Sequence, residues 1–182
     1  MRVILSLIFS MVFISLSIEA KTILLSIKGP GSGNPFWASV EKGAQDAAKE
    51  LGVDLVILAP PQEGDVQAQV NQVEDQIAKG VDGIAIAPAD PNALASVLAD
   101  AISSGVPVVF IDTMGSNEGV TFIGTNNENG AELAANYICD KVAKGSDVAI
   151  LTGVETQSTA LYRRDGATKG LKACGLNIVA TQ

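Results

Sequence analysis

Short apolar segments alternate with amphipathic helical segments along the chain from residue 21 onwards. The apolar segments lack polar alternation, which is typical of strands that are buried on both faces of a parallel sheet. Strands separated by amphipathic helices indicate βαβ units, so the predicted fold class is α/β with a doubly wound parallel sheet. We expect strands at 22–27, 54–59, 83–87, 107–111, 120–123, 147–151 and 177–180, and helices at 36–51, 65–79, 91–104, 128–144 and 160–173.

Glycines and capping residues mark the ends of these predicted helices. Asp65 is a candidate N-cap, and Asp90-Pro91 is predicted to start the third helix with proline at its first position. Four glycines follow helical segments, where a residue with positive φ is favoured. They are Gly52, Gly80, Gly105 and Gly145.

A polar, turn-like segment at 124–130 divides the alternating pattern. One sheet of four or five strands is complete before it, whereas only two strands and two helices are predicted after it. Two strands cannot enclose a core of their own. We therefore predict a Rossmann-like lobe at 21–125 and a partial second lobe at 126–182, and expect the chain to be truncated or to need a partner.

The first twenty residues are predicted to be a signal peptide, 1–20, that is removed from the mature chain. Arg2 provides a positive start, an apolar segment follows at 3–18, and Ala20 offers a small residue at the cleavage point. The apolar segment is short for a membrane span, which needs about 20 residues. The sequence thus predicts export across the inner membrane to the periplasm, without a spanning helix.

Composition excludes several classes of function. The net charge of −8 argues against nucleic acid and anionic membranes as partners. The chain has no histidine, which argues against zinc and the usual histidine-dependent nucleophiles, so we predict no enzyme, metal or cofactor. Cys139 and Cys174 both fall in helical apolar patterns and are interpreted as buried thiols, although export leaves a disulfide as the alternative.

A candidate binding segment follows the first predicted strand, at the sheet edge where α/β proteins bind ligands. It contains Lys28, Asn34, Phe36 and Trp37. Two aromatic rings beside an amide and an ammonium suit a flat, polar ligand such as a sugar. The alternative is that Phe36 and Trp37 form only the first buried turn of a helix.

Polar residues of later segments are further candidates. Asp112 ends the fourth predicted strand, where a carboxylate could accept hydroxyl hydrogen bonds or merely cap a loop. Arg163 could donate to a ligand from the opposite lobe, but Arg163 and Arg164 could equally be solvated or pair with Asp165. Asn126 is a hinge, ligand or turn candidate.

Other features favour no site. Glu63 is interpreted as a loop charge. The glycines at 29, 31 and 33 lack the spacing of a dinucleotide fingerprint, and the second strand ends in Ala59-Pro60-Pro61 where a ribose-binding acid should stand. Nucleotide binding is therefore not expected.

Taken in order, several motifs resemble those of the periplasmic sugar-binding proteins of ABC importers, in the ribose-binding group of type I periplasmic binding proteins. The chain looks most like the allose-binding proteins of that group. The resemblance extends over 21–182. The motifs are Asn34-Pro-Phe-Trp37, the segment 59–69, Gly83-Ile-Ala-Ile-Ala-Pro88 and Arg163-Arg-Asp-Gly-Ala-Thr168.

The resemblance implies two lobes joined by a three-strand hinge that close on one monosaccharide. By this analogy Asn34 would bond sugar hydroxyls, and Phe36 and Trp37 would stack on the sugar ring. Asp112 would accept hydroxyl bonds from the first lobe, and Arg163 would donate from the second.

Other positions agree less closely with the family. Lys28 matches a lysine of allose-binding proteins, whereas Asn126 stands where relatives often carry aspartate near the hinge. Thr113 stands where ribose-binding relatives carry arginine, which weakens the case for ribose itself.

The implied function is that of an exported receptor that delivers an allose- or ribose-like monosaccharide to an ABC permease, as a monomer when full length. The alternatives are a signalling receptor for a sugar-like autoinducer or chemoattractant, or a truncated fragment that binds nothing. An exported Rossmann-type enzyme and the effector domain of a regulator are less consistent with the motifs.

Overall fold

The computed structural model describes residues 20–182, so the predicted signal peptide lies outside the described residues apart from Ala20. All the predicted strands and helices are present, which confirms the α/β fold class. The strands are β1 (Thr22–Ser26), β2 (Asp54–Leu58), β3 (Gly83–Ile86), β4 (Val108–Ile111), β5 (Thr121–Ile123), β6 (Asp147–Ile150) and β7 (Asn177–Thr181). The helices are α1 (Pro35–Leu51), α2 (Val66–Ala78), α3 (Ala95–Ser103), α4 (Asn127–Cys139) and α5 (Ser158–Ala173).

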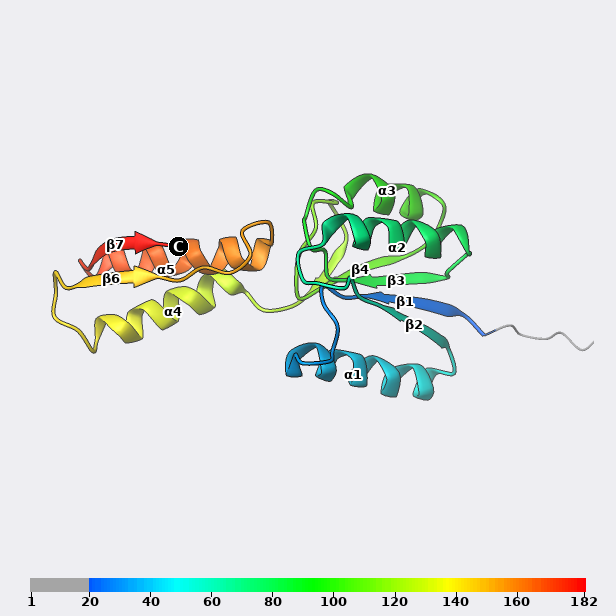
Figure 1. Cartoon of the computed structure of the whole chain (residues 1–182), viewed down its shortest axis with the longest axis horizontal. Helices are drawn as coiled ribbons and strands as arrows, with labels where there is room; N and C mark the ends of the chain where they lie inside the picture. Colours follow the sequence, from blue (N-terminus) through cyan, green and yellow to red (C-terminus); the bar gives the residue numbers. More distant parts are fainter. Residues whose placement is uncertain (1–19) are drawn as a thin grey trace, which may run out of the picture.

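The first unit comprises β1 to β5 with α1 to α3. Its five strands are parallel in the order β2-β1-β3-β4-β5. Helix α1 covers one face of the sheet, and α2 and α3 cover the other (Figure 1). Neighbouring residues of β1 enter different cores, because Leu24 packs with Phe110 whereas Leu25 packs with Trp37. The sheet is buried on both faces, as its apolar strands predict.

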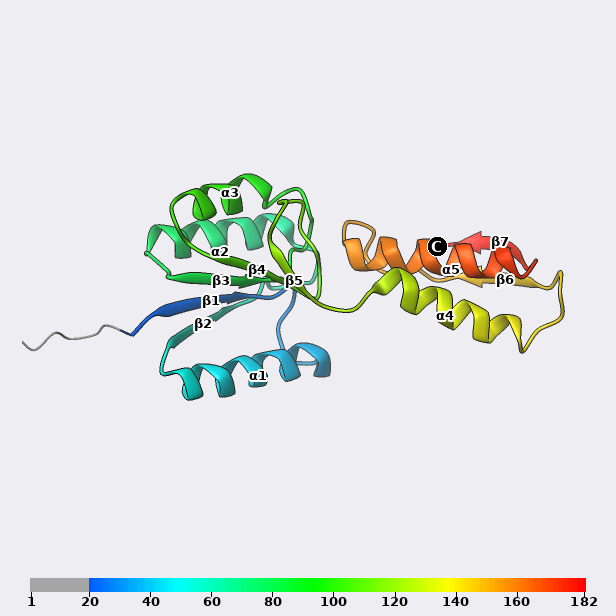
Figure 2. The same cartoon turned by 180° about the vertical axis from the view of Figure 1, so that it is seen from behind.

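The second unit comprises α4, β6, α5 and β7, and follows the first unit through a single extended segment (Figure 2). Strands β6 and β7 pair in parallel, with a register shift between Val148 and Ala149. Ala135, Ile150 and Leu171 lie in its small core. The predicted division at residue 125 agrees with the break between the two sheets and stays a prediction.

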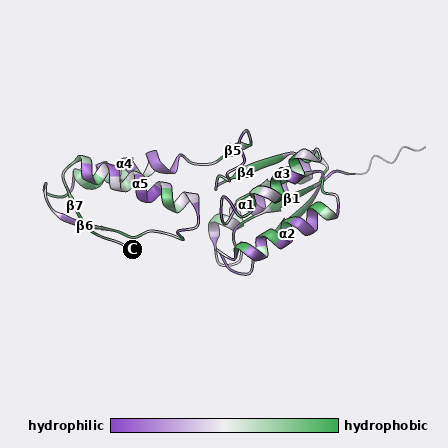
Figure 3. Ribbon diagram, turned by 90° about the horizontal axis from the view of Figure 1, so that it is seen from above, coloured by the Kyte–Doolittle hydropathy of each residue, from purple (hydrophilic) through white to green (hydrophobic). Residues whose placement is uncertain are grey.

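Hydropathy distinguishes the sheet from its surroundings. In Figure 3 the strands of the first unit are mostly hydrophobic, and hydrophobic and hydrophilic residues alternate along α2. This is the pattern expected of a helix with one face on a sheet. Within residues 20–182, no helix has the length and apolar character that crossing a bilayer requires.

The third helix begins later than predicted. Asp90 accepts hydrogen bonds from the backbone N–H groups of Asn92 and Ala93, at 2.8 and 2.9 Å, and so closes a turn. Helix α3 begins only at Ala95. The prediction that Pro91 is the first helical residue is therefore wrong, because the aspartate side chain satisfies a turn instead of a helix end.

The other predicted helix ends are mostly confirmed. Asp65 caps α2 by accepting from the backbone N–H of Ala68 at 3.1 Å. Helix α4 ends at Cys139, so the predicted end at 144 is wrong, and Gly145 instead occupies the turn before β6. The remaining predicted glycines follow their helices with positive φ. They are Gly52 at 66°, Gly80 at 83° and Gly105 at 87°.

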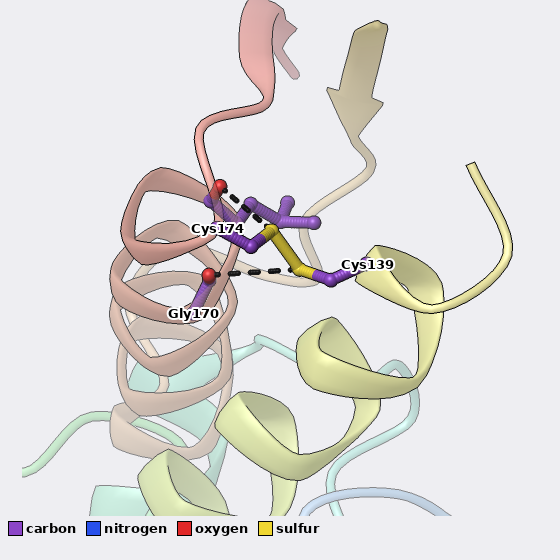
Figure 4. Close-up of a disulfide and its surroundings, with 4 residues drawn as sticks. Cys139, Gly170 and Cys174 are labelled. Atoms are coloured by element: carbon purple, nitrogen blue, oxygen red, sulfur yellow. Dashed lines mark hydrogen bonds between the residues drawn. A yellow bond between two sulfur atoms is a disulfide. The ribbon is translucent and has the colours of Figure 1, made fainter. Parts of the chain in front are cut away.

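Cys139 and Cys174 form a disulfide, so their interpretation as buried thiols is wrong (Figure 4). Their Cα atoms are 6.1 Å apart, within the usual range for a bridge. The bridge joins the last residue of α4 to the residue after α5. The two helices pack side by side with their ends together, which the separation of 35 residues in sequence could not reveal.

Glycines on α5 allow this close packing. A Cβ atom on Gly166 would overlap the carbonyl oxygen of Glu128 on α4, and one on Gly170 would lie 2.6 Å from the Cβ of Ala135. The backbones of α4 and α5 are therefore in direct contact, and a side chain at either glycine would force the helices apart.

We expect Gly166→Ala to lower the free energy of unfolding by about 1–3 kcal/mol, because overpacking displaces α4. Gly43→Ala is the matched control, since a Cβ on this α1 glycine meets no atom within 4 Å. Helix propensity predicts that the control raises stability by about 0.5–1 kcal/mol. Urea denaturation measures both, and equal stabilities for the two variants would contradict the packing described.

Removing the disulfide is expected to lower the free energy of unfolding by about 2–4 kcal/mol, because the bridge restricts the unfolded chain. The double variant Cys139→Ala/Cys174→Ala and the reduced protein should have similar melting temperatures in thermal denaturation, both lower than that of the oxidised protein. Thiol titration of the denatured protein without reductant provides an independent check. Two reactive thiols in that titration would show that the bridge is absent.

Candidate ligand-binding site

Lys28 lies at the centre of a buried polar cluster, just beyond the carboxyl end of β1. Its side chain is 3% exposed, and its Nζ lies 3.0 Å from Oδ2 of Asp112. The same Nζ donates to Oε1 of Gln157 at 2.8 Å and lies 5.7 Å from the centre of the Trp37 ring. An ammonium has three N–H donors, so one remains for a ligand.

Asp112 follows β4 and has an unusual backbone. Its φ of 54° makes it the one residue other than glycine with positive φ in the described part of the chain. A hydrogen bond from the backbone N–H of Thr113 to the C=O of Ile111 closes a three-residue turn around it. Such a conformation costs on the order of 1–3 kcal/mol, and residues that adopt it cluster at functional sites.

The turn fixes the direction of the Asp112 carboxylate. Oδ2 accepts from Lys28 and also from the hydroxyl of Thr113 at 3.1 Å. No described residue donates to Oδ1, and the side chain is 19% exposed. A charged acceptor is thus held ready for a donor on a ligand, and charged acceptors form the stronger hydrogen bonds.

The two aromatic residues at the start of α1 have different surroundings. Asn34 caps this helix by accepting from the backbone N–H of Phe36 at 3.1 Å. Trp37 is 2% exposed and packs in the core with Leu25 and Ile27, so the alternative of a buried first turn describes it correctly. Phe36 is 52% exposed, and its ring centre lies 4.9 Å from that of Trp37. Of the two rings, that of Phe36 is accessible to a ligand.

The predicted residues of the second unit are separate from the Lys28 cluster. Asn126 caps α4 by accepting a backbone hydrogen bond at 3.0 Å. Arg163 is exposed, and its Nε donates to Oδ1 of Asn127 at 2.7 Å. Arg164, in contrast, pairs with Asp165, as one of the alternatives expected. The guanidinium of Arg163 keeps its terminal nitrogens for other partners.

Sequence reasoning missed two residues that link the site. Gln157, just before α5, is buried, and its amide accepts from Lys28 while its Nε2 donates to Oε1 of Glu63 at 3.0 Å. Glu63 is therefore more than a loop charge. The signal that could have found Gln157 is its place after β6, where a strand leads into a helix.

Two cavities adjoin these residues. One of about 320 Å³ is lined by Asp112 and Asn126, together with Ser158 from the start of α5. A wider groove of about 990 Å³ is lined by residues that include Gln157 and Arg163. Of the predicted residues, Asp112, Asn126 and Arg163 line one of the two cavities. The others line neither cavity: Lys28, Asn34, Phe36 and Trp37. The smaller volume suits a small ligand.

The groups of the candidate site are suited to binding a polar ligand. The site offers a carboxylate, an ammonium, amides, a guanidinium and one exposed aromatic ring. Within residues 20–182 no group of three or more possible metal ligands is clustered. A small molecule with several hydroxyl groups and an apolar face matches these donors, acceptors and ring.

Comparison with known proteins agrees with this description. The chain is 35% identical over 158 residues to the D-ribose/D-allose-binding protein of Pseudomonas aeruginosa, covering 82% of this chain and 50% of the relative. It is 36% identical to the D-allose-binding periplasmic protein of Escherichia coli, covering 82% of this chain and 51% of the relative. The chain spans about half the length of the curated relatives it matches.

Solved structures give the same result. An ABC transporter solute-binding protein from Actinobacillus succinogenes with bound D-allose has a TM-score of 0.78 and 28% identity, covering 89% of this chain and 59% of that chain. A solute-binding protein from Burkholderia multivorans has a TM-score of 0.82 and 31% identity, covering 90% and 60%. Residues 26–182 match the family described as periplasmic binding protein domain. The chain belongs to this family and has the type I periplasmic binding protein fold.

Proposed function

We propose that this protein is a periplasmic receptor that captures an allose- or ribose-like monosaccharide between its two units and delivers it to an ABC permease. The observation that carries the proposal is the buried Lys28–Asp112 pair, which a residue of the second unit, Gln157, also contacts. The names of the relatives, which include ribose- and allose-binding proteins, support the choice of ligand.

Residues of the first unit would hold one side of the sugar. Oδ1 of Asp112 accepts from a hydroxyl, and the third N–H of Lys28 donates to a neighbouring hydroxyl oxygen. The exposed ring of Phe36 covers the apolar C–H face of the sugar, while Trp37 supports Phe36 from behind. Nδ2 of Asn34 donates to a hydroxyl, since its Oδ1 is occupied in capping α1.

Residues of the second unit would close over the opposite side. The terminal nitrogens of Arg163 donate to sugar oxygens, since its Nε is held by Asn127. Asn126, beside Asp112 in the smaller cavity, presents its Nδ2 in the same way as Asn34. Ligand contacts to both units favour the closed arrangement, because a ligand stabilises the state to which it binds more tightly.

The ligand leaves this site unchanged, as in a transport receptor. Relatives are named as binding proteins, some of them as periplasmic, and the predicted signal peptide agrees with that location. A signalling receptor would use the same binding step and differ only in the membrane protein that it contacts. We expect the partner to be the permease of a sugar importer.

Isothermal titration calorimetry of the purified protein with D-allose and D-ribose tests the proposal. We expect saturable binding of at least one of these sugars with one site per chain. NAD serves as the control ligand, and the absence of a ribose-binding acid predicts no heat with it. No binding of either sugar would favour the alternative of a fragment that binds nothing.

Phe36→Ala is expected to weaken sugar binding by about 1–2 kcal/mol, or about 5–30-fold, because the ring no longer covers the sugar. The free energy of unfolding of this variant should change little, since the Phe36 side chain is half exposed. Leu51→Ala removes another exposed apolar side chain, at the end of α1 and outside both cavities, and should leave the dissociation constant unchanged. Calorimetry measures both variants, and an unchanged affinity for Phe36→Ala would exclude the stacking role.

Trp37→Ala should act differently, because Trp37 belongs to the core of the first unit. We expect it to lower the free energy of unfolding by about 3–5 kcal/mol, and any loss of binding would follow from that. The two aromatic residues are thus separable by stability, measured by thermal denaturation.

A further inference from the structure

Three consecutive side chains at the start of α5 form hydrogen bonds from the second unit to the first. This run, residues 156–158, lies where the chain leaves β6 and enters the helix. The bonds are Thr156 Oγ1 to the C=O of Ala89 at 3.4 Å, Gln157 Oε1 from Lys28 at 2.8 Å, Gln157 Nε2 to Glu63 at 3.0 Å, and Ser158 Oγ to the C=O of Met114 at 3.2 Å. Because these bonds join protein groups directly, they hold the two units together without requiring a ligand.

Gln157 differs from its two neighbours in this run. Its bonds reach charged side chains, whereas those of Thr156 and Ser158 end on backbone carbonyls. Gln157 and Lys28 are both buried, so the bond between them is shielded from water, whereas Glu63 is exposed. Hydrogen bonds to charged groups contribute more than neutral ones, and a low local dielectric strengthens them further.

The amide of Gln157 also matches its two partners in polarity. Its oxygen meets the ammonium of Lys28 and its nitrogen meets the carboxylate of Glu63. A side chain that lacks either the acceptor or the donor would break one of these two bonds. Loss of the bond to Lys28 would leave this buried ammonium with Asp112 as its one side-chain partner among the described residues, which costs more than the loss of a neutral bond.

We propose that Gln157 is a positioning residue that closes the two units on each other before a sugar binds and holds Lys28 toward Asp112. Closure without ligand goes beyond closure that is driven by ligand contacts. Its consequence for sugar affinity rests on the proposed function, whereas the closure itself does not. The apparent affinity for a ligand is proportional to the fraction of molecules in the closed, binding-competent form. If the units are partly closed before the sugar binds, this fraction is larger and the sugar binds more tightly.

The variant Gln157→Glu tests whether Gln157 holds the two units together. Small-angle X-ray scattering of the ligand-free protein at pH 8 measures the radius of gyration, which increases if the units separate. The new carboxylate still accepts from Lys28 but faces Glu63, and like charges at this distance repel. We expect an increase in the radius of gyration beyond experimental error. Gln45→Glu, on the exposed surface of α1, makes the same change of charge and should leave the radius unchanged.

The double variant Gln157→Glu/Glu63→Gln exchanges the amide and the carboxylate. The new amide at 63 donates to the new carboxylate at 157, so the bridge is restored with the net charge of the original protein. We expect its radius of gyration to return to the original value, which a general loss of packing would not produce. Coupling of this kind is what a double-mutant cycle isolates.

Two results would overturn the proposal: an unchanged radius in Gln157→Glu, or a radius that stays enlarged in the double variant. Circular dichroism first verifies that each variant is folded. If Gln157→Glu does not fold, Gln157→Met replaces it, since methionine has similar length and forms neither hydrogen bond, and the same increase in radius is expected. An unchanged radius in that variant would equally overturn the proposal.

Sugar affinity then separates this proposal from the proposed function. If the protein binds a sugar, Gln157→Glu should weaken binding by about tenfold or more, and the double variant should recover most of it. If it binds no sugar, the scattering result still decides whether Gln157 closes the units. Open and closed forms are thus measured independently of the ligand.

Discussion

The buried ammonium of Lys28 is the interaction on which the site depends. A buried charge is costly unless its N–H groups form hydrogen bonds or ion pairs. The ammonium of Lys28 has two such partners, Asp112 and Gln157. Asp112 can meet it because the chain turns through an unfavourable backbone conformation directly after β4. Gln157 can meet it because the second unit lies against the first. Electrostatics, backbone strain and the arrangement of the two units are therefore connected through one side chain.

The parallel sheet explains why these residues meet. Strands β1 and β4 point in the same direction with β3 between them, so the residues that follow them emerge at one edge. That edge is where open α/β sheets bind ligands, because the backbone turns there and side chains are free of the core. The second unit faces this edge with the start of α5. The proposed site is therefore divided between the two units.

Much of the fold could be predicted from the sequence because the spacing and the number of apolar residues in a segment are local properties, and they distinguish strands from helices. The start of α3 was missed because Asp90 closes a turn, a choice that depends on which backbone groups its side chain meets. The disulfide was missed because the approach of Cys139 to Cys174 follows from the packing of α4 on α5. Lys28 and Asp112 were identifiable from their places at strand ends. Gln157 lies farther from its strand, and only its place between β6 and α5 pointed to it, because its role is defined by its contacts across the two units.

A crystal structure of the protein grown with D-allose tests the central claim most directly, since the claim is that one sugar lies between the two units against the Lys28–Asp112 pair. We predict a sugar with hydroxyl groups within about 3 Å of Oδ1 of Asp112 and Nζ of Lys28, and with one face on the ring of Phe36. A sugar bound elsewhere, or an empty site at saturating concentrations of both D-allose and D-ribose, would contradict the account.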